Sequence, residues 1–155
     1  MVKRAFTNRK MYALLMLGIG LVGITGLLAA CSSSQYSSNG ERIYYTATSS
    51  SGDRITYTGG FTMMQPLACV NCHGPNGKGG SINMMMYSFE APDITWTHLT
   101  ADVHPDHPPY TEATVKQAIT EGVDPAGNPL DEEMPRWSMS SSDLNDLINF
   151  MKTLK

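Results

Sequence analysis

One short run of residues constrains this chain more than any other: Cys69-Val70-Asn71-Cys72-His73. On a helical turn, residues three positions apart lie on the same side, so both sulfurs would face one direction with an imidazole directly after them. Core residues are few around this run, because residues 74–92 and 102–109 are rich in Gly or Pro and predict loops. Loops of this length in a compact domain are functional or packed on something. We therefore expect the chain to fold around a large bound group.

The spacing C-x-x-C-H is the attachment signature of c-type haem. The two thiols add across the two vinyl groups of one porphyrin, which explains why they must share one side of the backbone. His73 can then bind the iron from the proximal face. We therefore predict one covalent haem c, attached through Cys69 and Cys72.

Three other interpretations of the cysteine pair stay open at this point. A zinc site would need four ligands, namely Cys69, Cys72 and one or two of the four histidines. A redox-active pair of the thioredoxin type expects alternating strands and helices around it, and the chain shows no such alternation. An exported protein can also hold such a pair as a structural disulfide.

The first 30 residues indicate export. Four Lys and Arg residues lie within residues 1–10, and the uncharged apolar run Met11–Ala30 follows. The ending Leu28-Ala29-Ala30-Cys31 resembles the lipobox of bacterial lipoproteins, which implies cleavage before Cys31 and a lipid on its sulfur. An uncleaved membrane helix is the alternative, since about 20 apolar residues can cross a bilayer. In both cases we expect the body outside the cytoplasm, facing the periplasm or the cell exterior.

The residues after the export signal limit the choice of partners. Residues 31–40 are Ser-rich and uncharged, so we expect a flexible tether. Removing the four basic residues of the signal from the 11 Lys and Arg leaves 7 against 14 Asp and Glu, a net charge of −7. Such a body does not suit nucleic acid binding, which needs clustered Lys and Arg. It fits a cationic partner or simple solubility, and a redox protein partner would then carry Lys and Arg on its contact face.

A β-hairpin is predicted at the start of the body. Arg42–Thr48 and Arg54–Thr58 are rich in β-branched and aromatic residues, and a turn composition separates them. We therefore expect residues 41–60 to form a β-hairpin extension.

Two helices are predicted in the C-terminal part. Thr111 can cap a helix over Glu112–Glu121, whose apolar residues recur at helical spacing and which Gly122 is placed to end. Ser140 and Asp143 fit a capping box, and the residues after them mark one apolar face that continues to the C-terminus. The body is therefore expected to be mainly α.

Residues 61–155 resemble a small single-haem cytochrome c of class I. The resemblance rests on the terminal helix and on four segments: residues 69–80, 91–95, 122–130 and 134–137. It implies the cytochrome c fold, in which small helices and loops wrap around one haem. The predicted order is a lipoprotein-type signal peptide over residues 1–30, the lipidated Cys31 and tether over 31–40, the hairpin over 41–60 and the cytochrome c domain over 61–155.

The resemblance also implies that Met134 is the second axial ligand of the haem iron, with His73 as the first. Pro135 keeps the residue before it extended, which helps to present the thioether. Ligation by His and Met gives a higher reduction potential than ligation by two histidines. Other methionines and histidines are rival ligands: Met84, Met85, Met86, His98, His104 and His107.

Further residues near these segments have more than one interpretation. Met151 is expected to fill the core. Trp137 lies either beside the haem or in the core as an ordinary aromatic residue. Arg136 pairs either with a haem propionate or with the acidic run Asp131–Glu133. The resemblance implies that Pro92 packs against the ring.

The predicted function is electron transfer and not catalysis. Two filled axial positions leave no open site for a substrate, and the protein then supplies a dry pocket and fixed ligands. We expect the protein to carry single electrons between membrane-associated redox partners. One alternative is a haem-bearing electron-entry subunit of a larger membrane-associated redox enzyme complex, with residues 42–58 as the docking element. Another is a haem sensor or peroxidase with one labile ligand.

Overall fold

The computed structural model describes residues 35–60, 67–84, 87–103 and 105–155. The chain divides into two units, Met1–Gln35 and Tyr36–Lys155, and the second contains all the described residues except Gln35. The predictions for the signal peptide, Cys31, Met85, Met86 and His104 therefore concern residues outside the described ranges. Within those ranges, no helix combines the length and the apolar character that crossing a bilayer requires.

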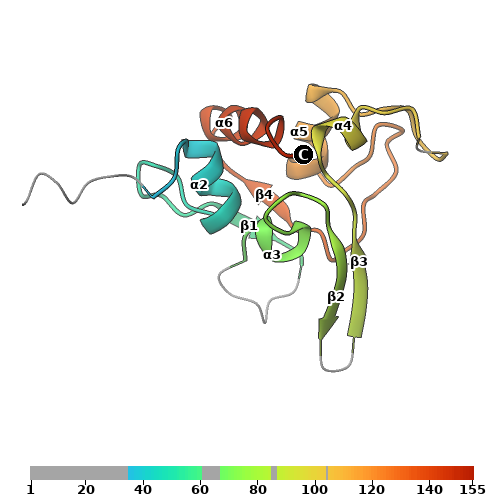
Figure 1. The fold of residues 1–155 in the computed structure, drawn as a ribbon, viewed down its shortest axis with the longest axis horizontal. Helices are drawn as coiled ribbons and strands as arrows, with labels where there is room; N and C mark the ends of the chain where they lie inside the picture. The colour runs from blue at the N-terminus through green and yellow to red at the C-terminus, as the bar shows by residue number, and fades with distance from the viewer. Residues whose placement is uncertain (1–34, 61–66, 85–86, 104) are drawn as a thin grey trace, which may run out of the picture. The chain divides into compact units, whose positions relative to one another are not determined.

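Five helices and two small antiparallel strand pairs form the described part of the second unit (Figure 1). The helices are α2 (Asn39–Thr46), α3 (Val70–His73), α4 (Trp96–Leu99), α5 (Glu112–Thr120) and α6 (Ser141–Met151). The strands are β1 (Thr56–Thr58), β2 (Gly80–Met84), β3 (Tyr87–Ala91) and β4 (Arg136–Ser138). Strand β1 pairs with β4, and β2 pairs with β3. Helices α2, α5 and α6 supply much of the buried core.

Helix α2 packs directly on helix α6, although the two lie at opposite ends of this unit's sequence. Ile43 and Tyr44 of α2 are 2% and 0% exposed. The Asn39 amide donates to the Asp146 carboxylate at 2.8 Å, across 107 positions of sequence. At Gly40 a Cβ atom would lie 1.9 Å from the Asp146 carbonyl oxygen. Only glycine therefore lets the two helix backbones approach this closely.

The β-hairpin predicted over residues 42–58 is wrong. Ser38 caps α2 by accepting a hydrogen bond from a backbone N–H of the first turn, and residues 42–46 continue that helix. Thr48 and Arg54 form only an isolated bridge, and β1 pairs with the distant β4. Two successive side chains of α2 are buried, which a strand with alternating faces would not allow. Packing thus overrides the β propensity of this segment.

This correction changes two further expectations. The tether predicted over residues 31–40 is too long, because Asn39 and Gly40 belong to α2. The interpretation as a subunit of a larger complex used the hairpin over residues 42–58 as its docking element. That interpretation loses the element on which it rested.

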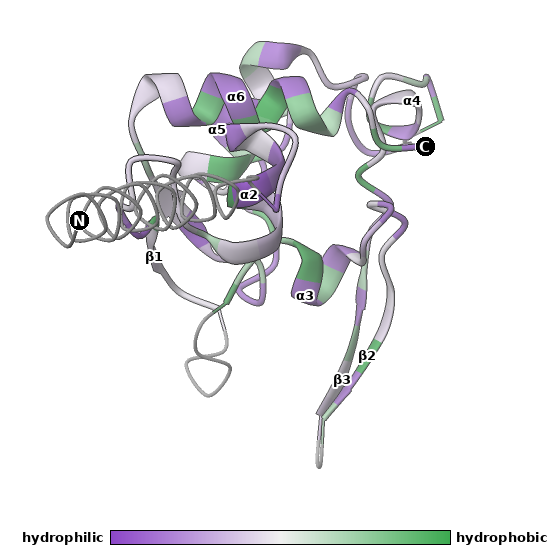
Figure 2. Cartoon of the chain, turned by 60° about the vertical axis from the view of Figure 1, so that its left-hand side comes forward, coloured by the Kyte–Doolittle hydropathy of each residue, from purple (hydrophilic) through white to green (hydrophobic). Residues whose placement is uncertain are grey.

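Residues 74–92 were expected to be loop, yet they contain a hairpin. Strands β2 and β3 pair with Gly80 opposite Ala91 and Met84 opposite Tyr87. The pair projects from the helices (Figures 1 and 2). Its strands contain Gly, Ser and Asn, which have low β propensity, so the sequence gives only a weak strand signal.

Both C-terminal helices lie within one residue of their predicted starts, and α5 ends one residue before its predicted end. Thr111 caps α5 and forms a capping box with Thr114. Gly122 follows the helix with φ of 72°. Ser140 caps α6 by accepting a hydrogen bond from the Asp143 N–H. Hydrophobic and hydrophilic residues alternate in bands along α6 (Figure 2), and its hydrophobic face is buried.

Candidate functional site

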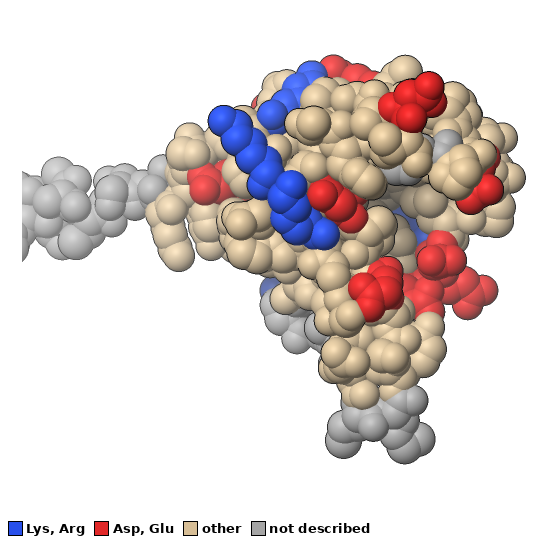
Figure 3. Space-filling model, turned by 45° about the vertical axis from the view of Figure 1, so that its right-hand side comes forward, with Lys and Arg blue, Asp and Glu red and all other residues tan. Residues whose placement is uncertain are grey.

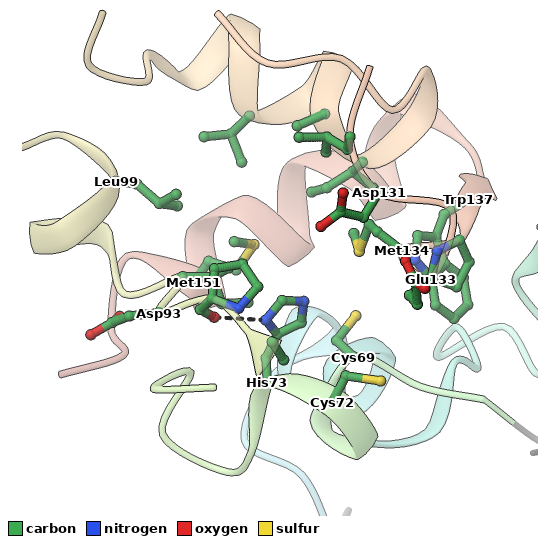
Figure 4. A pocket seen from close by; sticks show the side chains of 18 of the residues that line it. Cys69, Cys72, His73, Asp93, Leu99, Asp131, Glu133, Met134, Trp137 and Met151 are labelled. Carbon is green, nitrogen blue, oxygen red and sulfur yellow. Dashed lines mark hydrogen bonds between the residues drawn. The ribbon is translucent and has the colours of Figure 1, made fainter. Parts of the chain in front are cut away.

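A cavity of about 350 Å³ lies between α3, α5, α6 and the segments that follow β3 and precede β4 (Figure 4). Apolar side chains such as Leu99, Val115, Ile119 and Leu147 form much of its wall. Volumes of roughly 300–1,000 Å³ with apolar walls and few polar groups are typical of cofactor sites. The four predicted haem-binding residues all line it: Cys69, Cys72, His73 and Met134.

The two cysteines lie on the turn that begins α3. Cys69 directly precedes the helix and already has helical backbone angles. The Asn71 side chain accepts a hydrogen bond from the Ala68 N–H at 2.7 Å. Burial raises the pKa of Cys69 to about 12 and also raises the pKa of Cys72. Both are therefore neutral thiols near pH 7, and neither is bridged.

These properties argue against the three alternatives to haem attachment. A redox-active pair of the thioredoxin type needs a thiol that ionises easily, which burial disfavours here. Among the residues that the structure describes, no group of three or more His, Cys, Asp or Glu is placed to hold a metal ion. The free thiols do not form the disulfide of the third alternative.

His73, the last residue of α3, is only 6% exposed and reaches the cavity wall. Its Nδ1 lies 3.1 Å from the Pro92 carbonyl oxygen, the contact drawn as a dashed line in Figure 4. A carbonyl can only accept, so Nδ1 carries the proton and Nε2 keeps its lone pair. Burial lowers the pKa of His73, which favours the neutral ring. This is the state in which histidine binds a metal, with its other nitrogen held by a carbonyl.

The loop after α3 is fixed by hydrogen bonds from α2. The Tyr44 hydroxyl donates to the Gly74 carbonyl at 2.6 Å, and the Tyr45 hydroxyl donates to the Pro75 carbonyl at 3.0 Å. The Gly79 N–H donates to the His73 carbonyl at 2.9 Å. These hydrogen bonds add to those of the helix and help to hold the backbone around the imidazole.

Met134 enters the cavity from the segment between α5 and β4 (Figure 4). It is half-buried, and Pro135 behind it is buried. Met151 of α6 also lines the cavity and is 4% exposed, so the residue expected to fill the core is a second methionine of the wall. Met84 does not line the cavity, whereas His98 and His107 do.

The structure combines the two interpretations of Trp137 and gives Arg136 partners that the sequence did not predict. Trp137 is 4% exposed, lies opposite Tyr57 in the β1–β4 pair and lines the cavity, so it is both a core aromatic residue and part of the wall. Arg136 donates to backbone carbonyls, including that of Asp131, and forms no ion pair with Asp131–Glu133.

Acidic side chains surround part of the cavity: Glu90, Asp93, Asp131 and Glu133. Figure 3 shows acidic groups clustered above the base of the β2–β3 hairpin. Across the described ranges, no Lys or Arg lines the cavity. The Tyr87 hydroxyl on β3 donates to the Glu133 carboxylate, a hydrogen bond that lowers the pKa of Glu133. This contact links the hairpin to the residue before Met134.

Sequence reasoning missed two supports of the site. The Pro92 carbonyl orients His73 through its backbone oxygen, and a backbone oxygen has no signature in the sequence. Tyr44 holds the loop after α3 from a helix that was expected to be a strand. The sequence signal that was available is the spacing of Ser38 and Glu41, which is typical of a helix start.

The family comparison matches this arrangement. The model of the cytochrome c family matches residues 37–155, so the match includes α2 as well as the cavity. Comparisons with curated proteins and with solved structures found no significant match. Cytochromes of this family carry covalently attached haem c, typically one in each domain, and serve in electron transfer. The chain belongs to the cytochrome c family, as a class I c-type cytochrome that carries electrons by means of haem.

Proposed function

We propose that this protein is an exported electron carrier with one haem c, attached through Cys69 and Cys72 and held by His73 and Met134 as axial ligands. The observation that carries the proposal is the hydrogen bond from His73 Nδ1 to the Pro92 carbonyl, 3.1 Å long. It leaves Nε2 available in the cavity that both sulfurs and Met134 also line.

The residues present fit a haem. The cavity wall is largely apolar, the two sulfurs come from one turn, and a neutral imidazole is oriented by its second nitrogen. A bound haem supplies a one-electron couple at its iron. The chain excludes water from that couple with its apolar wall, and the Pro92 carbonyl keeps the His73 proton on Nδ1. Met134 offers a thioether, which favours a higher potential than a second imidazole would.

The proposal includes a membrane anchor. The basic start, the apolar run and the ending before Cys31 support export, with a lipid on Cys31 holding the body at the membrane. The body then faces the periplasm or the cell exterior. A tether of Ser-rich residues allows it to move between membrane-associated donors and acceptors.

The charge of the body supports partners with basic contact faces. Four carboxylates line the cavity, and the net charge after the export signal is negative. Complementary charges mainly speed encounter, and salt screens them over about 8–10 Å at ordinary ionic strength. Electron transfer to such partners should therefore become slower as salt increases.

A haem-stained denaturing gel of the mature exported protein tests the attachment, and spectra of its oxidised and reduced forms test the axial pair. We expect haem to remain on the polypeptide after denaturation and both forms to show six-coordinate His/Met iron. A colourless protein, with zinc or nothing bound at Cys69 and Cys72, would overturn the proposal.

A further inference from the structure

Met134 lies on a segment that we call the distal segment, residues 122–136, which connects α5 to β4. Its first half is stabilised by its own hydrogen bonds. The Asp124 carboxylate accepts from the N–H groups of Ala126 and Asn128, each at 2.8 Å. The Leu130 N–H donates to the Gly122 carbonyl at 2.8 Å and closes this half into a loop.

The second half, where Met134 lies, has few such bonds. The Met134 N–H donates to the Asp131 carbonyl at 3.2 Å, and the Gly60 N–H donates to the Glu132 carbonyl at 3.1 Å. Neither bond fixes the Met134 carbonyl. The Met134 carbonyl instead accepts a hydrogen bond from a side chain at the end of the segment, that of Arg136.

Arg136 makes that connection with one guanidinium group. Its Nη1 donates to the carbonyls of Asp131, at 3.0 Å, and Met134. Its Nη2 donates to the carbonyls of Leu130, at 2.8 Å, and Gly122, at 3.4 Å. The planar guanidinium thus joins the end of α5, the closed loop and the residue expected to ligate the iron. A lysine ammonium has three donors on one atom and cannot span these four carbonyls in the same way.

Gly122 provides the space for this guanidinium. A Cβ atom at residue 122 would lie 1.8 Å from Arg136 Nε and 2.3 Å from its Cζ. Gly127, in the same segment, offers a matched comparison. It also has a positive φ, of 87°, but a Cβ there would meet nothing within 4 Å.

We propose that Arg136 is a positioning residue for the distal ligand: its guanidinium holds the backbone of Met134 so that the thioether stays on the haem iron. The inference rests on the proposed ligation by Met134 and adds the residue that maintains it. The pairing of β4 with β1 anchors the C-terminal end of the distal segment, because Arg136 of β4 lies opposite Thr58 of β1. Strand pairing keeps its Cα fixed while its side chain reaches back over the segment.

The test compares the mature holoprotein with R136K, which keeps the charge and loses the fork. We expect R136K to retain covalent haem, to have a lower reduction potential, and to bind carbon monoxide in the reduced form roughly tenfold faster or more. The reason is that losing two or more charge-assisted hydrogen bonds raises the population of the open segment by at least that factor. In a denaturant titration of the oxidised protein, the midpoint at which the thioether ligand is lost should also move to a lower denaturant concentration.

A second pair of variants gives an independent answer, even if R136K does not assemble. G122A displaces the guanidinium, whereas G127A adds the same backbone strain without touching it. We expect G122A to reproduce the faster carbon monoxide binding and lower potential, and G127A to stay near the parent in both. A G122A protein that is merely less stable, with parental potential and carbon monoxide binding, would show that Arg136 supports the fold alone and would overturn the inference.

Met134→Leu separates this failure from a failure of the proposed function. If Met134→Leu leaves the potential and the spectrum unchanged, Met134 is not the ligand and the ligation proposal fails. If Met134→Leu changes both while R136K and G122A change neither, the ligation stands and the positioning role of Arg136 is wrong.

Discussion

The two sides of the cavity are built in different ways. On the side of α3, the cysteines and His73 follow one another within five residues, and a helical turn with one backbone carbonyl sets their directions. On the opposite side, Met134 lies in irregular backbone, and its position depends on carbonyls from residues 122 to 134 that meet at Arg136. The α3 side therefore presents its groups from one helical turn, whereas the distal ligand lies on irregular backbone held by several side-chain contacts.

This difference bears on how each ligand can be lost. A ligand on a helical turn moves only if the turn unfolds, whereas a ligand in a loop moves when a few hydrogen bonds open. We therefore expect perturbations to detach Met134 before His73. The predictions that follow test this order, beginning with the largest expected effect.

Replacing both cysteines, C69A with C72A, should abolish covalent haem and cooperative folding. Without haem the apolar side chains around the cavity lose the large group against which they would pack, and such a loss is large compared with the stability of a domain. The haem-stained gel and circular dichroism measure the two losses. Cys31→Ala is the control, because it should keep the stain and change only the membrane fraction. A folded, cooperative double variant without haem would contradict the prediction.

Met134→Leu should lower the reduction potential and open the reduced iron to carbon monoxide, because it removes the sulfur and keeps a similar volume. Met151→Leu is the matched control, since Met151 also lines the cavity but comes from α6. We expect Met151→Leu to leave potential and carbon monoxide binding near those of the parent. Redox titration measures the potential, and flash photolysis measures carbon monoxide binding. If Met151→Leu changed both quantities and Met134→Leu changed neither, Met151 would be the ligand.

Tyr44→Phe should reduce the free energy of unfolding by about 1 kcal/mol, because it removes a hydrogen bond to the Gly74 carbonyl from a side chain that is 0% exposed. Tyr45→Phe removes the neighbouring bond to the Pro75 carbonyl, which is exposed, and should cost less. Denaturant titrations measure both differences. Neither variant should change the reduction potential, and a large fall in the potential of Tyr44→Phe would show that the position of His73 depends on this bond from α2.

The smallest effect concerns Glu112, which joins α5 to α6 on the distal side. Hydrogen bonds from Lys116 and Lys152 lower the pKa of Glu112 from 4.5 to about 2. Its contribution to stability is therefore complete above pH 4.5 and disappears as the pH falls through about 2. Glu112→Gln should flatten the dependence of Tm on pH within this window. The effect should shrink in high salt because the pair is exposed, and an unchanged pH dependence would exclude the contribution.

The same contrast explains how much of the molecule could be predicted from its sequence. The attachment turn and the two C-terminal helices were predicted because their signals are local: two cysteines and a histidine at fixed spacing, and caps at Thr111 and Ser140. Helix α2 was missed because its tyrosines favour a strand, and only packing against α6 decides otherwise.

The supports of the site were beyond sequence reasoning for a different physical reason. Arg136 was predicted to meet either the carboxylates of Asp131–Glu133 or a haem propionate. In the structure it pairs with none of those carboxylates and donates to four backbone carbonyls, which the sequence did not indicate. The Pro92 oxygen that orients His73 is likewise a backbone atom. Every residue has a carbonyl, so which of them a side chain meets depends on the folded path of the chain and not on residue type.

The contact between α2 and α6 has a consequence for how the molecule forms. Because Gly40 touches the backbone at Asp146, the first and last helices of this unit cannot meet until a loop of about a hundred residues has closed. Contacts between residues so far apart slow folding, because the chain loses the entropy of the open loop before the contact forms and stabilises the fold. A ribosome makes the α6 residues about a hundred positions after those of α2, so this helix pair cannot form until α6 has been synthesised. Until then the cavity beside Cys69 and Cys72 lacks the part of its wall that α6 supplies.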